Sequence, residues 1–169
     1  MNVPKDWISV NDETIIENLN RFDFTDEQLN SLLRFNNSAI NISSYTKYDL
    51  KKHAGIIPTI KIRTLTNPAK NSSDFLKFVE VSIESSKKVY ENFAIVEKPR
   101  VINITNQDVV MFSVKFTLSN AGTVYEIGSK SYYIPKDGYY ISLNFIEQIG
   151  KEDNEKFFEK LIQSIQLTK

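Results

Sequence analysis

Side chains that could catalyse a reaction are few in this sequence. His53 is the only histidine among the 169 residues, and there is no cysteine. A serine or cysteine triad needs an imidazole base that a third group holds in place. His53 instead follows Lys51 and Lys52 in a segment typical of a loop, just before Gly55. We therefore expect His53 to be a surface or loop histidine, and we expect no enzyme activity.

Acidic residues and glycines suggest no other chemistry. Glu80 and Glu84 share one face of a predicted helix, where a solvated surface explains them. The acidic run 152–155 begins the last predicted helix, where the positive end of the helix dipole favours carboxylates without a metal. The glycines stand alone, and no phosphate-binding loop or EF-hand spacing occurs. We expect neither a metal nor a cofactor.

Charge and hydropathy exclude further classes of protein. Lysine plus arginine and aspartate plus glutamate number 21 each, whereas nucleic-acid binding depends mainly on neutralising phosphates. No nucleic acid is therefore expected as a partner. No stretch approaches the ~18 apolar residues of a membrane span, and residues 1–7 lack the apolar centre of a signal peptide. Either the protein is cytosolic, or a leader or lipid-bearing cysteine lies upstream of this sequence.

The hydrophobic pattern predicts the elements that position these groups. Alternating apolar residues predict strands over 39–48, 56–65, 100–105, 109–118, 123–134 and 139–146, with a kink or bulge at Gly128. Helical spacing predicts a weak helix around Ile15, Ile16 and Leu19, a short helix that a capping box at Thr25 to Gln28 begins, and helices over 72–92 and 152–167.

These elements predict the class of fold. The turns between the last four strands are too short for parallel crossovers, so the sheet should be largely antiparallel. We expect a single domain over residues 1–169, of the α+β class, with helices packed on an antiparallel sheet. The clean alternation predicts one strongly buried face and one wetter or partly covered face.

A tyrosine-rich hairpin over residues 131–143 is the most distinctive feature. Tyr139 and alternate residues after it form an inner face, which sends Tyr140 to the opposite face. A turn at Lys136 and its neighbour would place Tyr133 directly across from Tyr140. Exposed tyrosines beside a cation suit a protein or ligand contact. We predict Tyr133, Tyr140 and Lys136 as a binding site; alternatively, a helix covers the tyrosines, or they only stabilise the hairpin as a cross-strand pair.

Three passages resemble the PsbP-like family. They are the opening Val3-Pro4-Lys5-Asp6-Trp7, the hairpin 131–143, and the closing helix 157–167 with its Ser164-Ile165. This resemblance implies an α/β/α sandwich, shared by an extrinsic photosystem protein, a nuclear Ran-binding protein and many small bacterial lipoproteins. Residues 14–49 depart from the family's pattern. The passages concern structure and imply no active site.

The resemblance also implies a class of function. Its members are mostly non-enzymatic and bind different partners, so we expect a bacterial accessory domain that binds another protein. An extracytoplasmic protein with a lipid anchor outside this sequence is favoured. Two alternatives remain: a cytosolic secretion adaptor or immunity-type protein, and a carrier of a small apolar ligand. For the carrier, the ligand would lie between sheet and helix, against Phe112, Phe116, Tyr139 and Phe157.

Overall fold

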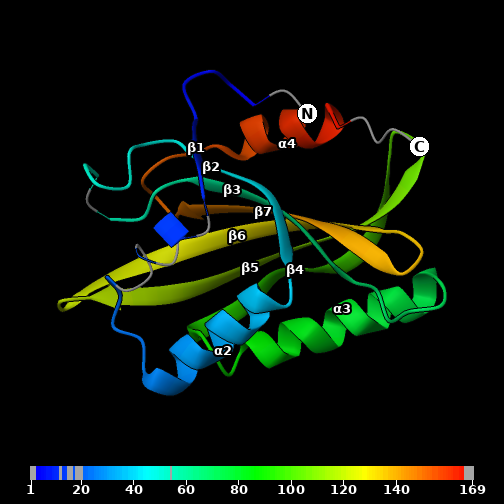
Figure 1. The fold of residues 1–169 in the computed structure, drawn as a ribbon, viewed down its shortest axis with the longest axis horizontal. Coiled ribbons are helices and arrows are strands. Elements are labelled where there is room, and N and C mark those ends of the chain that lie inside the picture. Colours follow the sequence, from blue (N-terminus) through cyan, green and yellow to red (C-terminus); the bar gives the residue numbers. More distant parts are fainter. Residues whose placement is uncertain (1–2, 12, 15–16, 18–20, 54, 166–169) are drawn as a thin grey trace.

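A seven-stranded antiparallel sheet organises the protein, as a computed structural model describes it for residues 3–11, 13–14, 17, 21–53 and 55–165 (Figure 1). The strands are β1 (Ile8–Val10), β2 (Ile40–Thr46), β3 (Thr59–Thr66), β4 (Glu91–Ile104), β5 (Gln107–Asn120), β6 (Thr123–Pro135) and β7 (Tyr139–Gln148). The helices are α2 (Asp26–Asn37), α3 (Ser72–Ser86) and α4 (Glu155–Gln163). The predicted α+β class and antiparallel sheet are confirmed.

Two meanders share the sheet, whose strand order is β1-β2-β3-β7-β6-β5-β4. The first meander is β1 to β3 and the second is β4 to β7, and they join where β3 pairs with β7 from Thr59↔Ile146 to Thr66↔Tyr139. Because β3 lies inside the sheet and β4 lies at its edge, the connection through α3 must cross one face. That crossing places α3 over the central strands.

Helices cover both faces of the sheet, with α4 on one side and α2 and α3 on the other (Figure 1). The core beneath α4 contains Trp7, Ile60, Ile62, Val109, Met111, Tyr132, Ile134, Leu143, Phe145, Phe158, Leu161 and Ile162. The core beneath α3 contains Phe22, Ile56, Leu65, Phe75, Val79, Ile83, Val110, Phe112, Val114, Phe116, Ile127 and Tyr140. Of the two alternatives for the second face, wetter or partly covered, the structure shows a covered face at the sheet's centre. Consecutive residues of β5 from Val109 to Phe112 are all buried, because each face has its own core.

The predicted starts of α2 and α3 agree with the structure better than the predicted end of α3. The capping box at α2 is present: the Thr25 amide donates to Gln28 Oε1 over 2.9 Å, and the Gln28 amide donates to Thr25 Oγ1 over 3.2 Å. Helix α3 was predicted over 72–92 but ends at Ser86, and Phe93, which fits helical spacing, belongs to β4. Ser82 and Ser86 donate back to helix carbonyls four residues earlier, a pattern that weakens helices.

Helix α4 and Gly128 also differ from the expectations. Helix α4 is shorter than the predicted 152–167. Gly128 is no bulge, since it pairs in regular register with Lys115 and Glu147. The weak helix predicted around Ile15, Ile16 and Leu19 falls on residues outside the described part of the chain.

The opening segment packs on the closing helix. The Trp7 ring lies 5.2 Å from the Phe157 ring and 6.3 Å from the Phe158 ring, centroid to centroid. Phe158 in turn stacks on Phe145 of β7 at 4.6 Å. Residues far apart in sequence thus form one aromatic layer that fastens α4 to the sheet.

Replacing Phe145 tests this layer. The side chain is 1% exposed, so Phe145→Ala removes buried aromatic area and leaves a cavity. We expect the free energy of unfolding to fall by about 3–5 kcal/mol in chemical denaturation. The control, Val124→Ala, changes a side chain that is 62% exposed and should stay within about 0.5 kcal/mol of the unmodified protein. Equal stabilities for the two variants would contradict this account of the core.

Candidate functional site

The tyrosine hairpin forms as predicted but with a different register. Tyr133 pairs with Ser142, and Tyr140 pairs with Pro135. The Lys136 amide donates to the Tyr139 carbonyl over 2.8 Å, so the turn consists of the next two residues, 137–138, where Gly138 has a φ of 76°. A turn that moves by one residue moves each cross-strand partner by two. Tyr133 and Tyr140 therefore stay on one face, but they are diagonal neighbours and not direct partners.

Helix α3 covers the tyrosine pair. The Tyr133 and Tyr140 rings lie 5.0 Å apart, and Tyr140, only 3% exposed, contacts Phe75 at 5.4 Å and Phe78 at 6.0 Å. The expected exposure is wrong for Tyr140, which α3 covers as the alternative proposed, whereas Tyr133 is half-buried. Lys136 donates from Nζ to Gln107 Oε1 at the start of β5. The sequence could not show that Tyr140 is buried, because it did not reveal which face of the sheet α3 crosses.

A cavity of about 150 Å³ lies between α3 and the sheet, beside the tyrosine pair. Its lining combines large aromatic rings with small polar side chains: Arg63, Ser82, Ile83, Ser86, Tyr90, Phe93, Phe112, Val114, Phe116, Ser129, Ser131, Tyr133, Tyr140, Ser142, Asn144 and Ile146. The lining proposed for an apolar ligand is divided by the sheet. Phe112 and Phe116 line this cavity, Phe157 packs against the core beneath α4, and Tyr139 is 44% exposed.

Burial and one cation set the electrostatics of this cavity. Burial raises the pKa of Tyr90 to about 12 and also raises the pKa of Tyr133 and of Tyr140. The charge of Arg63 opposes the rise at all three hydroxyls. The positive charge of the Arg63 guanidinium group therefore influences all three tyrosine hydroxyls around the cavity.

His53 lies in the loop between β2 and β3, as predicted. Its ring stacks on Tyr48 at 4.6 Å, and Nε2 lies 3.2 Å from Lys151 Nζ. Burial and the Lys151 charge lower the pKa of His53. These contacts of His53, with Tyr48 and Lys151, include no carboxylate and so assemble no triad within the described part of the chain.

A polar network fastens this loop to the start of α4. Glu152 accepts hydrogen bonds from Lys47 Nζ and, over 2.7 Å, from the Tyr48 hydroxyl. Burial opposes ionisation of Glu152, but these two bonds outweigh it and lower the pKa of the carboxyl. Asn154 accepts from the same Lys47 over 3.0 Å. The acidic run that begins the last helix therefore holds two loops together.

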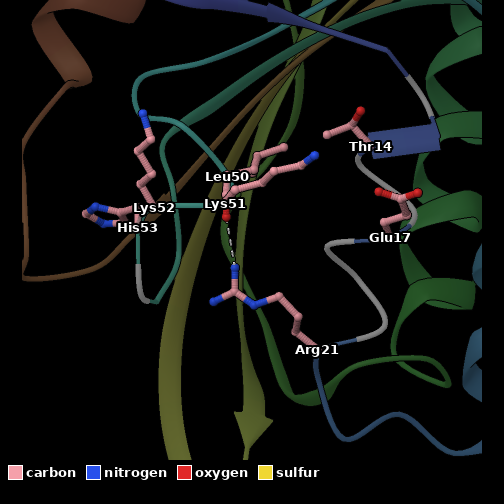
Figure 2. A pocket seen from close by; sticks show the side chains of 7 residues that line it. All are labelled: Thr14, Glu17, Arg21, Leu50, Lys51, Lys52 and His53. Atoms are coloured by element: carbon pink, nitrogen blue, oxygen red, sulfur yellow. Dashed lines mark hydrogen bonds between the residues drawn. The ribbon is translucent and has the colours of Figure 1, made fainter.

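A surface pocket of about 510 Å³ adjoins the same loop, lined by Thr14, Glu17, Arg21, Leu50, Lys51, Lys52 and His53. Figure 2 shows Lys51, Lys52 and His53 extending in different directions from the loop. The Arg21 guanidinium donates to the Leu50 carbonyl over 3.4 Å. Because the cationic groups diverge, this pocket does not present them to one ligand.

A groove of about 600 Å³ runs between α4 and the outer strands β4 and β5. Its lining is Glu97, Arg100, Ile102, Asn103, Ile104, Thr105, Met111, Lys130, Tyr132, Glu155, Glu159, Ile162 and Gln163. Sequence reasoning missed it. The pattern predicted a strand over 100–105, but no sequence signal showed that this strand forms an edge beside the last helix.

Lys130 organises the charge of this groove. Its Nζ lies 2.9 Å from Glu155, 3.8 Å from Glu159 and 3.9 Å from Glu97. Burial opposes the charge of this lysine, yet its hydrogen bond to Glu155 and the other carboxylates raise its pKa. The lysine side chain is 16% exposed, whereas the carboxylate side chains are 38% to 60% exposed. Arg100, 58% exposed, also lines the groove and lies 3.8 Å from Glu97. The rim of the groove therefore carries three carboxylates and one exposed cation, and is acidic on balance.

Two further findings concern metals and membranes. Over the described ranges, no three histidine, aspartate or glutamate side chains gather closely enough to hold a metal ion. No helix in the described part of the chain has the length and apolarity needed to cross a membrane.

Comparisons with known proteins identify a fold. No protein-family model and no curated protein matches the sequence. A protein of unknown function from Pseudomonas aeruginosa, PA94, has a similar structure, with a TM-score of 0.54 and 13% identity over 70% of this chain and 78% of that chain. LpqN of Mycobacterium tuberculosis, which is involved in cell envelope biogenesis, has a TM-score of 0.48 and 14% identity over 96% of this chain and 75% of that chain. At such identity the similarity to PA94 concerns the fold alone.

The tyrosines around the cavity predict a loss of stability in alkali. The unfolded chain loses the Tyr90 proton near the usual pKa of 10.0, whereas the folded protein keeps it to about pH 12. Above pH 10 the folded state therefore binds more protons, and the free energy of unfolding should fall as pH rises. Tyr90→Phe should make this fall shallower in urea denaturation at a series of pH values.

Tyr139→Phe is the matched control for this measurement. Tyr139 is 44% exposed and lies outside the cavity, so its loss should leave the pH slope of the unmodified protein. The same slope in all three proteins would refute the effect of burial on Tyr90.

Proposed function

We propose that this chain is a non-catalytic accessory domain of the PsbP-like type, which binds another protein at the outer edge of its sheet. The family resemblance supports the type of domain, and the antiparallel sheet with helices on both faces is compatible with it. The observation that carries the proposal is the end of β4, where an open strand edge lies beside the groove with an acidic rim.

The last five residues of β4 form a regular edge. They pair with β5 without a register shift, from Arg100↔Met111 to Ile104↔Gln107. The loop between the strands has two residues, Thr105 and Asn106, both with positive φ, so Ile104 and Gln107 close it as a hydrogen-bonded pair. Antiparallel pairs alternate in type. Val101 and Asn103 therefore direct their backbone groups away from β5, to the side where no described strand pairs with β4.

The first part of β4 is protected from strand addition. Register shifts interrupt its pairing between Glu91 and Ala94, between Ile95 and Glu97, and between Glu97 and Arg100. Lys98 and Pro99 lie in the last of these irregular stretches. Bulges, lysine and proline are the devices by which proteins prevent association of edge strands. Their absence from residues 100–104 leaves that segment as the part of β4 open to a partner.

The groove determines the chemistry of the partner. Its floor includes five apolar or aromatic side chains: Ile102, Ile104, Met111, Tyr132 and Ile162. Three exposed carboxylates, those of Glu97, Glu155 and Glu159, surround this floor near Lys130. An extended segment that pairs with β4 would send alternate side chains over the groove. Aliphatic side chains suit its floor, and lysine or arginine suits its rim.

A substitution at the edge tests this function. Val101→Pro removes an outward amide and leaves the pairing with β5 intact, as proline permits at an edge. We would select binders from a displayed library of short linear peptides and measure their affinity for each variant. Selected sequences should combine aliphatic and basic residues, and Val101→Pro should weaken them at least about tenfold, or ~1.4 kcal/mol.

Val101→Thr is the matched control, because it keeps the amide and a β-branched side chain. It should bind the selected peptides as the unmodified protein does, and bound peptide should shift the backbone amide resonances of residues 100–104. Peptides that bind Val101→Pro with unchanged affinity, or that shift resonances only elsewhere, would refute an interaction at this edge.

A further inference from the structure

We infer that the cavity between α3 and the sheet binds a small aromatic carboxylate. This site lies on the opposite face of the sheet from the groove, and it does not depend on the proposed protein-binding function. The inference rests on the origin of the cavity, its buried donors, its cation and its aromatic walls.

Small side chains that face one another create the space. Ser82 and Ser86 project from α3, and Ser129, Ser131 and Ser142 project from the sheet. Protein interiors are normally close-packed, so serines on both layers leave a gap where larger apolar side chains would meet. The resulting volume of about 150 Å³ equals that of an engineered cavity known to hold benzene. One six-membered ring fits in such a space.

The sheet supplies buried hydrogen-bond donors to this cavity. Asn144 Nδ2 donates to Ser129 Oγ over 2.9 Å and to Ser131 Oγ over 2.7 Å. The two serines are 8% and 2% exposed. A hydroxyl that accepts a bond still has its own hydrogen to donate, so both serines can offer a donor to a guest in the cavity. A carboxylate can accept several such bonds at once.

Arg63 adds a positive charge to the same space. It lines the cavity, and its charge acts on the hydroxyls of Tyr90, Tyr133 and Tyr140. Guanidinium groups bind carboxylates strongly, through charge-assisted hydrogen bonds. An anionic guest would gain an attraction to this charge that a neutral guest of the same shape lacks.

Aromatic walls favour a ring over an inorganic anion. The Phe116 ring stacks on Tyr90 at 4.1 Å, and the Phe112 ring meets Tyr133 edge to face at 5.1 Å. Another aromatic ring can pack against these walls in the same offset or edge-on geometries. Phosphate or sulfate would leave them without contact. An aromatic ring bearing one carboxylate uses both the walls and the polar floor.

Benzoate is the probe that matches this description, and benzamide is its neutral counterpart of the same shape. In ligand titrations followed by protein NMR, we expect saturable benzoate binding at least about tenfold tighter than benzamide binding. Arg63→Gln should remove that preference. Ser82→Leu should fill the cavity from α3 and abolish binding of both compounds.

Ser85→Leu is the matched control on the same helix. Ser85 donates to a carbonyl four residues earlier, as Ser82 does, but its side chain is exposed, so this variant should bind benzoate normally. Val101→Pro should also bind it normally, which separates this site from the peptide site. Circular dichroism would confirm that each variant is folded.

Three results would overturn the inference. Absence of saturable benzoate binding would mean that the cavity holds only water. Equal affinity for benzoate and benzamide would exclude recognition of the carboxylate. Benzoate binding to Ser82→Leu with the affinity of Ser85→Leu would place the compound elsewhere on the protein.

Discussion

Every second side chain of β6 and β7 must enter the same core, because helices cover both faces of the sheet. Tyr132 therefore packs edge to face on Phe145 at 5.8 Å beneath α4, while the adjacent Tyr133 packs beside Tyr140 beneath α3. A slip of one residue would exchange the two sets of side chains and place each in the wrong core. The central hairpin thus fixes the positions of both helical layers and of both sites described above.

The sequence predicted what period-two alternation determines and failed where distant segments meet. Alternation correctly assigned Tyr133 and Tyr140 to one face, since an error of two residues in register preserves the face. It could not show that α3 buries Tyr140, because the path of α3 depends on β4 pairing at the far edge of the sheet. The sequence also does not reveal the strand order, so it could not predict the groove beside residues 100–104. The cavity remained hidden because its serines lie on three different elements, α3, β6 and β7, and share no common spacing.

The core beneath α4 is closely packed and contributes stability, whereas the core beneath α3 contains the proposed ligand site. Beneath α4, aromatic side chains such as Trp7, Phe145 and Phe158 pack on one another and fasten both ends of the described chain to the sheet. Beneath α3, serines interrupt the packing and leave polar groups around a cavity. A gap of this kind forgoes contacts that a close-packed core would gain. The aromatic layer on the opposite face supplies the packing that lets the domain tolerate it.

Strand β5 separates the two proposed sites by a single layer of backbone. Met111 lines the groove beneath α4, and Phe112, its neighbour, lines the cavity beneath α3. Strand β5 is hydrogen-bonded on both sides, to β4 and to β6, and it pairs with β6 from Val110↔Tyr133 to Asn120↔Thr123 without a register shift. A strand held in this way resists displacement at one residue alone. Binding at one face should therefore leave the other site largely unchanged, unless it alters the register or twist of the whole β4–β5 hairpin.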